Sequence, residues 1–212
     1  MIGSAAFWNR HATGYAARNF GNPAAYEATL SRVRAHLSPG DNVLELGCGT
    51  GTTALRLADT GARIEAWDHA SAMIALAQAK PEAAAAADVT FHAGEIEAAI
   101  ARGPFDAVLA FNLLHLLDDL DATLAGIHGA LRPGGLILSK TICKPDRGGP
   151  VLYHLLRACL PLLQRLGKAP AMRLRRVSAL EAAVRHAGFE IIETGNYPDA
   201  PPRRFIVARK PG

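Results

Sequence analysis

The residues with the clearest chemical potential in this chain lie in one short run around residue 47. Residues 43–51 read VLELGCGTG, an alternation that predicts the end of a buried strand, followed by glycines at every second position. A helix-compatible run begins immediately afterwards, at residues 52–58. Where a strand turns directly into a helix, backbone N–H groups are free, and glycine lets a ligand come within contact distance of them. We therefore expect a ligand to bind at this turn.

An acidic residue follows at a distance that fits this site. Residues 62–67 predict the next strand, and Asp68 stands at its carboxyl end, 21 residues after Gly47. Because the tips of adjacent parallel strands in a βαβ unit lie side by side, Asp68 is expected to face the glycine turn. A carboxylate there can accept hydrogen bonds from both hydroxyls of a ribose, as in NAD or S-adenosylmethionine.

The spacing of the glycines distinguishes these two ligands. A dinucleotide-binding turn has the pattern Gly-x-Gly-x-x-Gly, but its third glycine would fall on Thr52. The chain instead has Gly-x-Gly-x-Gly, with Glu45 two residues upstream. Glu45 is a poor neighbour for a pyrophosphate and a good one for a ligand that carries an ammonium group and a sulfonium. The turn therefore favours S-adenosylmethionine.

With these features the chain resembles the class I S-adenosylmethionine-dependent methyltransferases over most of its length. Residues 45–51 resemble the first motif of the family, and Asp68 resembles its ribose-binding acid. Residues 94–96 resemble the loop that meets the adenine, although many relatives have Asp where Glu95 stands. Residues 105–112 resemble the fourth strand and the active-site residues that follow it.

The resemblance also implies which residues bind the cofactor and that S-adenosylmethionine leaves as S-adenosylhomocysteine. Tyr15 lies in an aromatic N-terminal segment that folds over the cofactor in similar enzymes, or it covers the surface. Met73 is placed to pack against adenine, or it belongs to the core, and Cys48 is best explained as a small residue filling the turn. The predicted cofactor-binding residues are Tyr15, Glu45, Gly47, Cys48, Gly49, Gly51, Asp68, His69, Met73, Glu95, Ile96, Asn112 and Leu113.

Catalytic residues are less clearly marked. Methyl transfer is an in-line displacement in which orientation can supply about 7–11 kcal/mol, and a base is needed only when the acceptor must lose a proton. His115 follows the fourth strand and could act as that base, or it packs at the start of a helix. Tyr153 and His154 are weaker candidates. The eight histidines show no metal-ligand spacing, so we expect no metal site.

Alternating strand-like and helical runs predict an α/β fold. The strands are expected at residues 42–46, 63–67, 89–92, 107–111 and 136–141, with helices between them that include residues 71–80 and 120–131. The resemblance adds a turn into the fifth strand at residues 131–137. Such alternation requires parallel strands with crossover helices, so helices cover both faces of the sheet.

The two ends of the chain depart from this alternation. Residues 1–20 are expected to be irregular, and Asn22-Pro23 to begin an amphipathic helix. Ser178 is expected to cap a helix that stops at Gly188. Residues 189–194 and 204–208 predict two strands that pair antiparallel because their link is short. The predicted fold is a doubly wound, mostly parallel seven-stranded sheet with a C-terminal antiparallel hairpin, as in class I methyltransferases.

The length of 212 residues fits one domain of this kind. We expect residues 1–40 to form an N-terminal cap and helix, 41–142 the cofactor-binding core, 143–177 a substrate lid, and 178–212 the last helix and the hairpin. No run resembles a signal peptide or approaches the roughly 20 apolar residues of a membrane span. The three cysteines form neither a disulfide framework nor a zinc site. A cytoplasmic protein is therefore expected.

The basic residues are concentrated in one segment of the chain. The net charge is +4, yet no acidic residue occurs between Asp146 and Glu181. This segment includes a leucine-rich stretch, residues 150–166, which is expected to be helical and broken by Pro161. It is a solvated surface, a lid over an acidic or amphiphilic small molecule, or a contact for membrane or RNA. Its cations are Arg147, Arg157, Arg165, Lys168, Arg173, Arg175 and Arg176.

The sequence thus predicts an S-adenosylmethionine-dependent methyltransferase that acts on an anionic or amphiphilic small molecule. After the fourth strand the chain lacks the (Asn/Asp/Ser)-Pro-Pro-(Tyr/Phe) motif common among enzymes that methylate amide or base nitrogens. An RNA methyltransferase is the first alternative, although no separate RNA-binding module is seen. A nicotinamide-dependent oxidoreductase and a catalytically silent nucleoside-binding protein of the same fold are the others.

Overall fold

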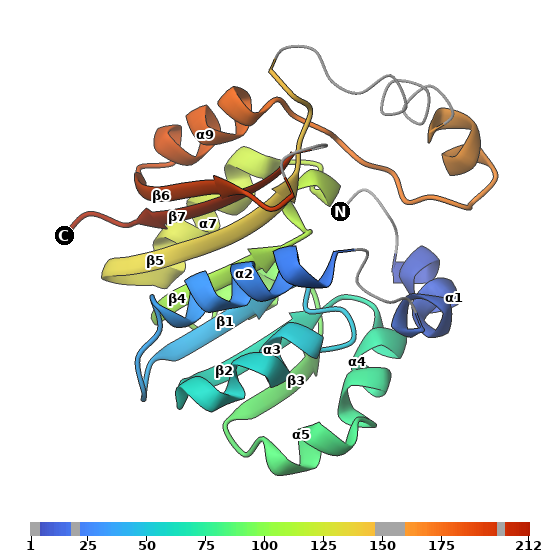
Figure 1. The fold of residues 1–212 in the computed structure, drawn as a ribbon, viewed down its shortest axis with the longest axis horizontal. Coiled ribbons are helices and arrows are strands. Elements are labelled where there is room, and N and C mark those ends of the chain that lie inside the picture. Colours follow the sequence, from blue (N-terminus) through green and yellow to red (C-terminus); the bar gives the residue numbers. More distant parts are fainter. Residues whose placement is uncertain (1–4, 18–21, 147–159, 199–201) are drawn as a thin grey trace.

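The computed structural model describes residues 5–17, 22–146, 160–198 and 202–212. Its centre is a seven-stranded sheet in the order β3-β2-β1-β4-β5-β7-β6 (Figure 1). Strands β1 to β5 pair parallel to one another, while β7 pairs antiparallel with both β5 and β6. The predicted fold class is therefore confirmed. The strands are β1 Asn42–Leu46, β2 Arg63–Asp68, β3 Val89–Ala93, β4 Phe105–Phe111, β5 Leu131–Ile142, β6 Glu190–Asn196 and β7 Arg203–Arg209.

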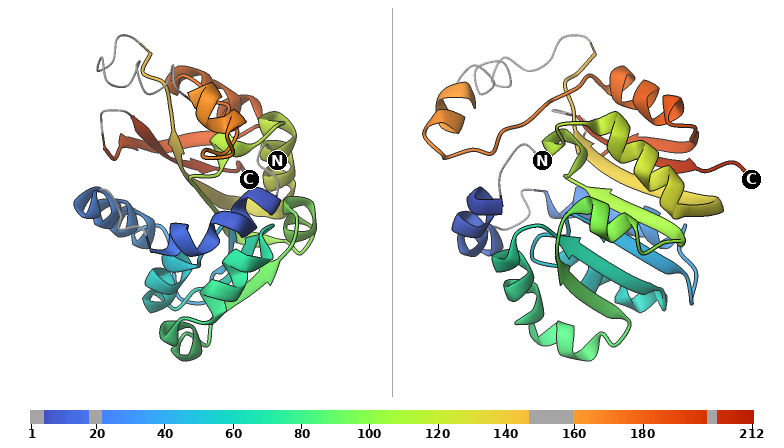
Figure 2. Two further views of the ribbon diagram at one scale, coloured as in Figure 1. Left: turned by 90° about the vertical axis from the view of Figure 1, so that its right-hand side faces the viewer. Right: turned by 180° about the vertical axis from the view of Figure 1, so that it is seen from behind.

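Helices cover both faces of the sheet. Figure 2 shows this from the side and from behind, relative to the view of Figure 1. Alternate residues of each strand contribute to opposite cores. One core joins the sheet to α2, α3 and α4, and the other joins it to α6, α7 and α9. The helices are α1 Ala5–Ala16, α2 Pro23–Arg34, α3 Thr52–Leu57, α4 Ser71–Gln78, α5 Pro81–Ala85, α6 Ile96–Ile100, α7 Leu120–Ala130 and α9 Val177–His186, with short 3-10 turns η1 Ala58–Thr60 and η2 Leu114–Leu116.

Helix α2 begins where its sequence predicts. The Asn22 side chain accepts a hydrogen bond from the N–H of Ala25 at 2.9 Å, and Pro23 is the first helical residue. Since α2 leads by a short connection into the amino end of β1, its own first turn lies at the carboxyl end of the parallel strands. The phenol of Tyr26 confirms this direction, because it is hydrogen bonded to Thr53 in the first turn of α3 at 3.1 Å.

The prediction that residues 1–20 are irregular was wrong. Residues Ala5–Ala16 form helix α1, which packs against α4 through buried Ala12 and Met73. The side chain of Asn9 also accepts a hydrogen bond from the N–H of Ala72 at 2.9 Å. Trp8, Ala12 and Tyr15 follow a spacing of four and three residues, which places them on one helix face. That spacing was available in the sequence but was masked by the polar residues between its members.

Smaller corrections concern where other elements begin. Strand β5 starts at Leu131, ahead of the strand expected at residues 136–141, because Leu131 pairs with Phe105 before a register shift. Ser178 does not cap α9; Asp146 accepts hydrogen bonds from the Ser178 hydroxyl at 2.7 Å and from its N–H at 3.3 Å. Pro161 is the second residue of a described helical stretch at residues 160–165, and the part of the predicted helix that precedes it lies outside the described residues. Gly188 ends α9 with a φ of 91°, as predicted.

Candidate active site

The glycine turn after β1 has the backbone conformation that the sequence required. Gly47, Gly49 and Gly51 have φ angles of 67°, 56° and 70°, which side chains other than glycine rarely adopt. A Cβ on Gly47 would lie 2.9 Å from Leu113 Cδ1, and one on Gly51 would collide with the ring of Phe91. The turn is therefore closed to larger residues both by its conformation and by its neighbours.

Asp68 holds the glycine turn through its carboxylate. Its Oδ2 accepts the N–H of Gly49 at 2.9 Å, and its Oδ1 accepts the N–H of Ala70 at 2.9 Å. Burial raises the pKa of Asp68 above its ordinary value, and these two N–H groups partly offset that effect. Because a carboxylate has about four lone-pair sites, Asp68 can accept further hydrogen bonds from a ligand.

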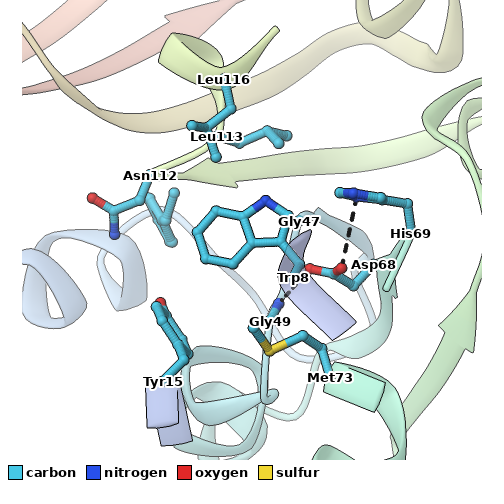
Figure 3. Close-up of a pocket in the computed structure, with 11 residues that line it drawn as sticks. Trp8, Tyr15, Gly47, Gly49, Asp68, His69, Met73, Asn112, Leu113 and Leu116 are labelled. Atoms are coloured by element: carbon cyan, nitrogen blue, oxygen red, sulfur yellow. Dashed lines mark hydrogen bonds and ion pairs between the residues drawn. The ribbon is translucent and has the colours of Figure 1, made fainter. Parts of the chain in front are cut away.

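A pocket of about 430 Å³, partly open to solvent, lies at the carboxyl ends of β1, β2 and β4 (Figure 3). Eight of the predicted cofactor-binding residues line it, so residues 98 positions apart meet at one place. In Figure 3 the indole of Trp8 projects between Asn112 and Asp68. The lining residues are Trp8, Tyr15, Gly47, Gly49, Asp68, His69, Met73, Phe111, Asn112, Leu113 and Leu116.

Two lining residues have features that suit ligand binding. Asn112 has a φ of 53°, a conformation that Asn tolerates better than most residues. Its N–H donates to the carbonyl of Lys140 at 2.7 Å, which fixes the turn after β4. The Nε2 of His69 is buried and has no hydrogen-bond partner in the part of the chain that the structure describes, while its Nδ1 lies 3.8 Å from the Asp68 carboxylate. An unpaired buried nitrogen at a pocket wall is available to a ligand.

Glu45 was predicted to bind the cofactor, but it lies behind the pocket wall. It is 2% exposed, and its Oε2 has no hydrogen-bond partner among the described residues. Burial raises the pKa of Glu45 to about 8, although an N–H of Ala54 partly opposes the rise. Burial therefore favours the protonated, uncharged form of this side chain in the absence of a ligand.

The other predicted cofactor-binding residues outside the pocket lining are placed as follows. Cys48 is buried in the turn, and its thiol donates a hydrogen bond to the Gly49 carbonyl at 3.7 Å. Burial raises the pKa of this thiol. Gly51 is the residue before α3. Glu95 precedes the first residue of α6, and Ile96 packs into the core on the α6, α7 and α9 side of the sheet.

His115, the candidate base, does not line the pocket either. It lies in η2, is 4% exposed, and its Nδ1 has no partner among the described residues. Burial, together with the nearby charge of Arg203, lowers the pKa of His115 to about 4. Its imidazole is neutral at physiological pH and takes up a proton with difficulty. Tyr153 and His154 lie outside the described residues.

Trp8, Phe111 and Leu116 line the pocket but were not predicted. Trp8 escaped notice because α1 was expected to be irregular; its ring lies 5.9 Å from that of Tyr15 at 88°. Phe111 is the last residue of β4, and Leu116 is in η2. Since the carboxyl ends of parallel strands meet at one edge of the sheet, the position of Phe111 was a usable signal.

The basic segment is fastened to this end of the sheet by its backbone. The N–H of Arg173 donates to the carbonyl of His115 at 2.7 Å, and the N–H of Lys144 donates to the carbonyl of Arg175 at 2.7 Å. Leu162 and Leu166 are 62% and 59% exposed. Arg147 and Arg157 lie outside the described residues. The described part therefore runs beside η2, with a mixture of exposed and half-buried side chains.

Neither a membrane span nor a metal site emerges from the described residues. None of their helices is long and apolar enough to cross a bilayer. No three His, Cys, Asp or Glu side chains in the described ranges gather closely enough to hold a metal ion.

Comparison with known proteins assigns the family. A methyltransferase domain profile matches residues 43–135. A ubiquinone biosynthesis O-methyltransferase from Methylobacterium nodulans is 30% identical over 154 residues, which are 72% of this chain and 61% of that protein. The chain thus spans less than two thirds of the length of this relative.

Two solved structures illustrate the fold at lower sequence identity. The cyclase SpnF is 20% identical, with a TM-score of 0.71 over 87% of this chain and 81% of the other. Magnesium protoporphyrin IX methyltransferase from Synechocystis, with bound S-adenosylhomocysteine, is 18% identical with a TM-score of 0.70 over 99% and 96% of the two chains. Because one of these proteins is a cyclase, the fold by itself does not specify methyl transfer.

Proposed function

Since this chain belongs to the class I S-adenosylmethionine-dependent methyltransferase family, we propose that it transfers a methyl group from S-adenosylmethionine to a small-molecule acceptor. The observation that carries the proposal is the meeting of the glycine turn, Asp68 and Met73 around one pocket. Asp68 and the backbone of the glycine turn are polar, as are the ribose and the amino-acid part of this cofactor, while Met73 offers an apolar surface to its adenine. Bound there, the cofactor supplies a methyl group already activated by its positive sulfur.

The residues present fit the cofactor in specific ways. Asp68 has lone pairs left for two ribose hydroxyls, and Met73 offers a flexible apolar surface to an adenine. The unpaired Nε2 of His69 can bond a polar atom of the nucleoside. Gly47 and Gly49 line the pocket, so their backbone can meet the amino-acid part of the ligand. Glu95 and Ile96 keep their proposed position near the adenine, beyond the residues that line the pocket.

Glu45 acts in this proposal through its charge. A cationic ligand at the glycine turn favours the ionised form of a nearby carboxyl group. Binding would therefore lower the raised pKa of Glu45, release a proton, and create an attraction that is absent from the free protein. Cys48 and Gly51 keep the turn compact and make no polar contact to the ligand.

The chain's main contribution to the reaction is orientation. Asn112, Leu113 and Leu116 line the side of the pocket toward β4 and η2, where an acceptor would approach the methyl. Trp8 and Tyr15 cover the pocket from α1 and exclude water. Holding the acceptor in line can contribute about 7–11 kcal/mol to lowering the barrier. In this scheme His115 packs behind the acceptor side and does not abstract a proton.

We further propose that the protein works in the cytoplasm and methylates an oxygen atom of an anionic or amphiphilic small molecule. The name of the Methylobacterium nodulans relative supports oxygen. Residues 143–177 are proposed to cover the acceptor and to help select it. The backbone bonds from Arg173 to His115 and from Arg175 to Lys144 support this, because they fix the segment beside the pocket.

Ligand binding followed by label transfer tests the proposal. S-adenosylhomocysteine at about 100 times its dissociation constant should stabilise the protein by roughly 2.7 kcal/mol, while NADH should not. A shift with NADH alone would refute the cofactor assignment. Transfer of labelled methyl from S-adenosylmethionine to hydroxylated aromatic acceptors then separates an enzyme from a silent binding protein. Binding without transfer to any acceptor, RNA included, would favour the silent protein.

A further inference from the structure

Lys140 is a buried cation on strand β5. Among the lysines and arginines in the described ranges it alone is buried, at 6% exposed. Its ammonium donates hydrogen bonds to the Thr29 hydroxyl at 2.7 Å and to the Ala25 carbonyl at 3.4 Å. Both acceptors are neutral, and no carboxylate in the described residues forms an ion pair with it. A buried charge without a counter-ion costs several kcal/mol, so its presence calls for an explanation.

The position of Lys140 connects it to the pocket. Phe111 of β4 pairs in register with Lys140 of β5, so both side chains point to the same face of the sheet. Phe111 lines the pocket, and the adjacent Asn112 donates its N–H to the Lys140 carbonyl. The ammonium therefore lies one strand beyond the pocket wall, under the first turns of α2 at the carboxyl end of the sheet.

A second cation continues the same row. Lys140 pairs with Phe205 of β7, and Arg203 lies two residues before Phe205 on the same face. Diagonal neighbours of this kind are about 7–8 Å apart. Arg203 is exposed and forms no ion pair with a described residue. Its charge is close enough to lower the pKa of Lys140, which burial and Arg203 together bring to about 8.

We infer that Lys140 and Arg203 form an anion-binding subsite that extends the pocket past Phe111 and holds an oxyanion group of the acceptor. This inference rests on the proposed function, because it assigns the chemistry of the acceptor side of the same site. A carboxylate or phosphate between the two cations would supply the counter-ion that Lys140 lacks. Arg203, at the surface, meets the anion first, and Lys140 fixes it at the bottom of the subsite.

The rival explanation is purely structural: Lys140 ties α2 to β5 through Thr29. Two variants separate the explanations. Lys140→Met removes the cation and the tie, whereas Thr29→Val removes the shortest hydrogen bond of the tie and leaves the cation. Arg203→Gln removes the exposed cation without touching α2, and it is expected to fold because the side chain lies in solvent.

The experiment measures the affinity of benzoate, phenyl phosphate and the neutral analogue benzamide by calorimetry, with and without S-adenosylhomocysteine. The wild-type protein should bind one or both anions at least about tenfold more tightly than benzamide. The anion that gains most identifies the group as carboxylate or phosphate. Lys140→Met and Arg203→Gln should each lose most of this preference, while Thr29→Val keeps it.

Three results would overturn the inference. They are equal binding of the anions and benzamide by the wild type, an unchanged preference in Arg203→Gln, and loss of the preference in Thr29→Val alone. Asp199 is the one acidic residue outside the described ranges. If Asp199→Asn raises anion affinity about tenfold or more, the cations are already paired and the subsite is rejected. Anion preference without S-adenosylhomocysteine binding would instead refute the cofactor and leave the subsite standing.

Discussion

The sheet edge around the pocket holds acidic groups at one end and basic groups at the other. At the β1 and β2 end lie the buried carboxyl groups of Glu45 and Asp68. At the β5 and β7 end lie the cations Lys140 and Arg203, without acidic partners in the described residues. The acidic half, which holds Glu45 and Asp68, suits a cationic sulfonium ligand. The basic half, which holds Lys140 and Arg203, suits an anionic acceptor. A donor and an acceptor of opposite charge would thus be held at their own ends, with the methyl between them.

The two halves also differ in rigidity of construction. The half beside β1 and β2 is built from backbone: the Gly49 and Ala70 N–H groups are bonded to Asp68, and neither Gly47 nor Gly51 has room for a Cβ. The cationic end is built from side chains, which reach across from neighbouring elements. A site made of backbone binds one ligand class and resists substitution. A site made of side chains can be altered one residue at a time, which is expected where related enzymes differ in acceptor.

The largest expected effect is a loss of stability in the acidic half, at Gly51 of the glycine turn. Gly51→Val adds a Cβ that meets Phe91 and Ala77 and forces a φ of 70° on a branched residue. Overpacking of about 1–3 kcal/mol and a left-handed conformation of about 1–2 kcal/mol should together lower the free energy of unfolding by about 2–5 kcal/mol. Gly40→Val is the control, because φ is 87° there and nothing lies within 4 Å. Equal losses in urea unfolding of the two variants would show that the contacts at Gly51 do not matter.

Asp68 gives the next largest effect, on ligand affinity. Asp68→Ala removes the acceptor of two backbone N–H groups and of the proposed ribose hydroxyls. Hydrogen bonds to charged groups are worth about 1.5–3 kcal/mol, so S-adenosylhomocysteine should bind roughly ten- to a hundredfold more weakly by calorimetry. Asp68→Asn keeps one acceptor oxygen and should lose less. Unchanged affinity in Asp68→Ala would mean that the ligand does not contact this residue.

The difference between the halves explains what could be predicted from the sequence. The glycine turn and Asp68 are constrained by local geometry, and spacing along the chain reports such constraints directly. Lys140 and Arg203 are 63 residues apart and meet because β7 inserts beside β5. No local pattern marks that pairing. The sheet order itself was expected only through the resemblance, and α1 was missed because its apolar face is narrow.

His115 shows the same limit in the other direction. Its position after β4 predicted a side chain near the methyl, and Leu116 of the same turn η2 does line the pocket. The side chain nevertheless turns into the core, where it is buried beside β5. Sequence placed the backbone correctly and could not decide the direction of one side chain in a short 3-10 turn, since that direction depends on packing against distant residues.

The pH dependence of stability tests whether Glu45, in the acidic half, is buried as the structure shows. The folded protein raises the pKa of Glu45 to about 8, from an ordinary value of 4.5. Between these values the unfolded chain binds fewer protons than the folded one, so the free energy of unfolding falls as the pH rises. Glu45→Gln should remove this fall and be more stable than wild type by about 1–3 kcal/mol at pH of about 9, with little difference at about pH 5. Urea unfolding at both pH values measures it, and parallel curves would place Glu45 in a solvated environment.

The smallest expected effect concerns the cations of the basic segment, and it sharpens the comparison at its other end. Arg173 and Arg176 are exposed and Arg175 is half-buried. Arg173 is 3.7 Å from Asp118 in an ion pair that is more than half exposed. The segment is held by backbone hydrogen bonds, so replacing all three side chains by Gln should leave it in place. Exposed charges contribute about 0–1 kcal/mol each, so losing the field that they add should raise the Michaelis constant of an anionic acceptor only severalfold.

Lys140 and Arg203, in contrast, are expected to contact the acceptor and to matter more. The triple Gln variant should therefore show a modest increase in the Michaelis constant, lost at high salt, with S-adenosylmethionine affinity unchanged. Asp118→Asn is the matched control, because it frees Arg173 and should shift the constant slightly the other way. If the triple variant instead loses more acceptor affinity than Arg203→Gln, selection lies in the basic segment. Loss of RNA or vesicle binding, steeply dependent on salt, would assign these cations to a macromolecular surface instead.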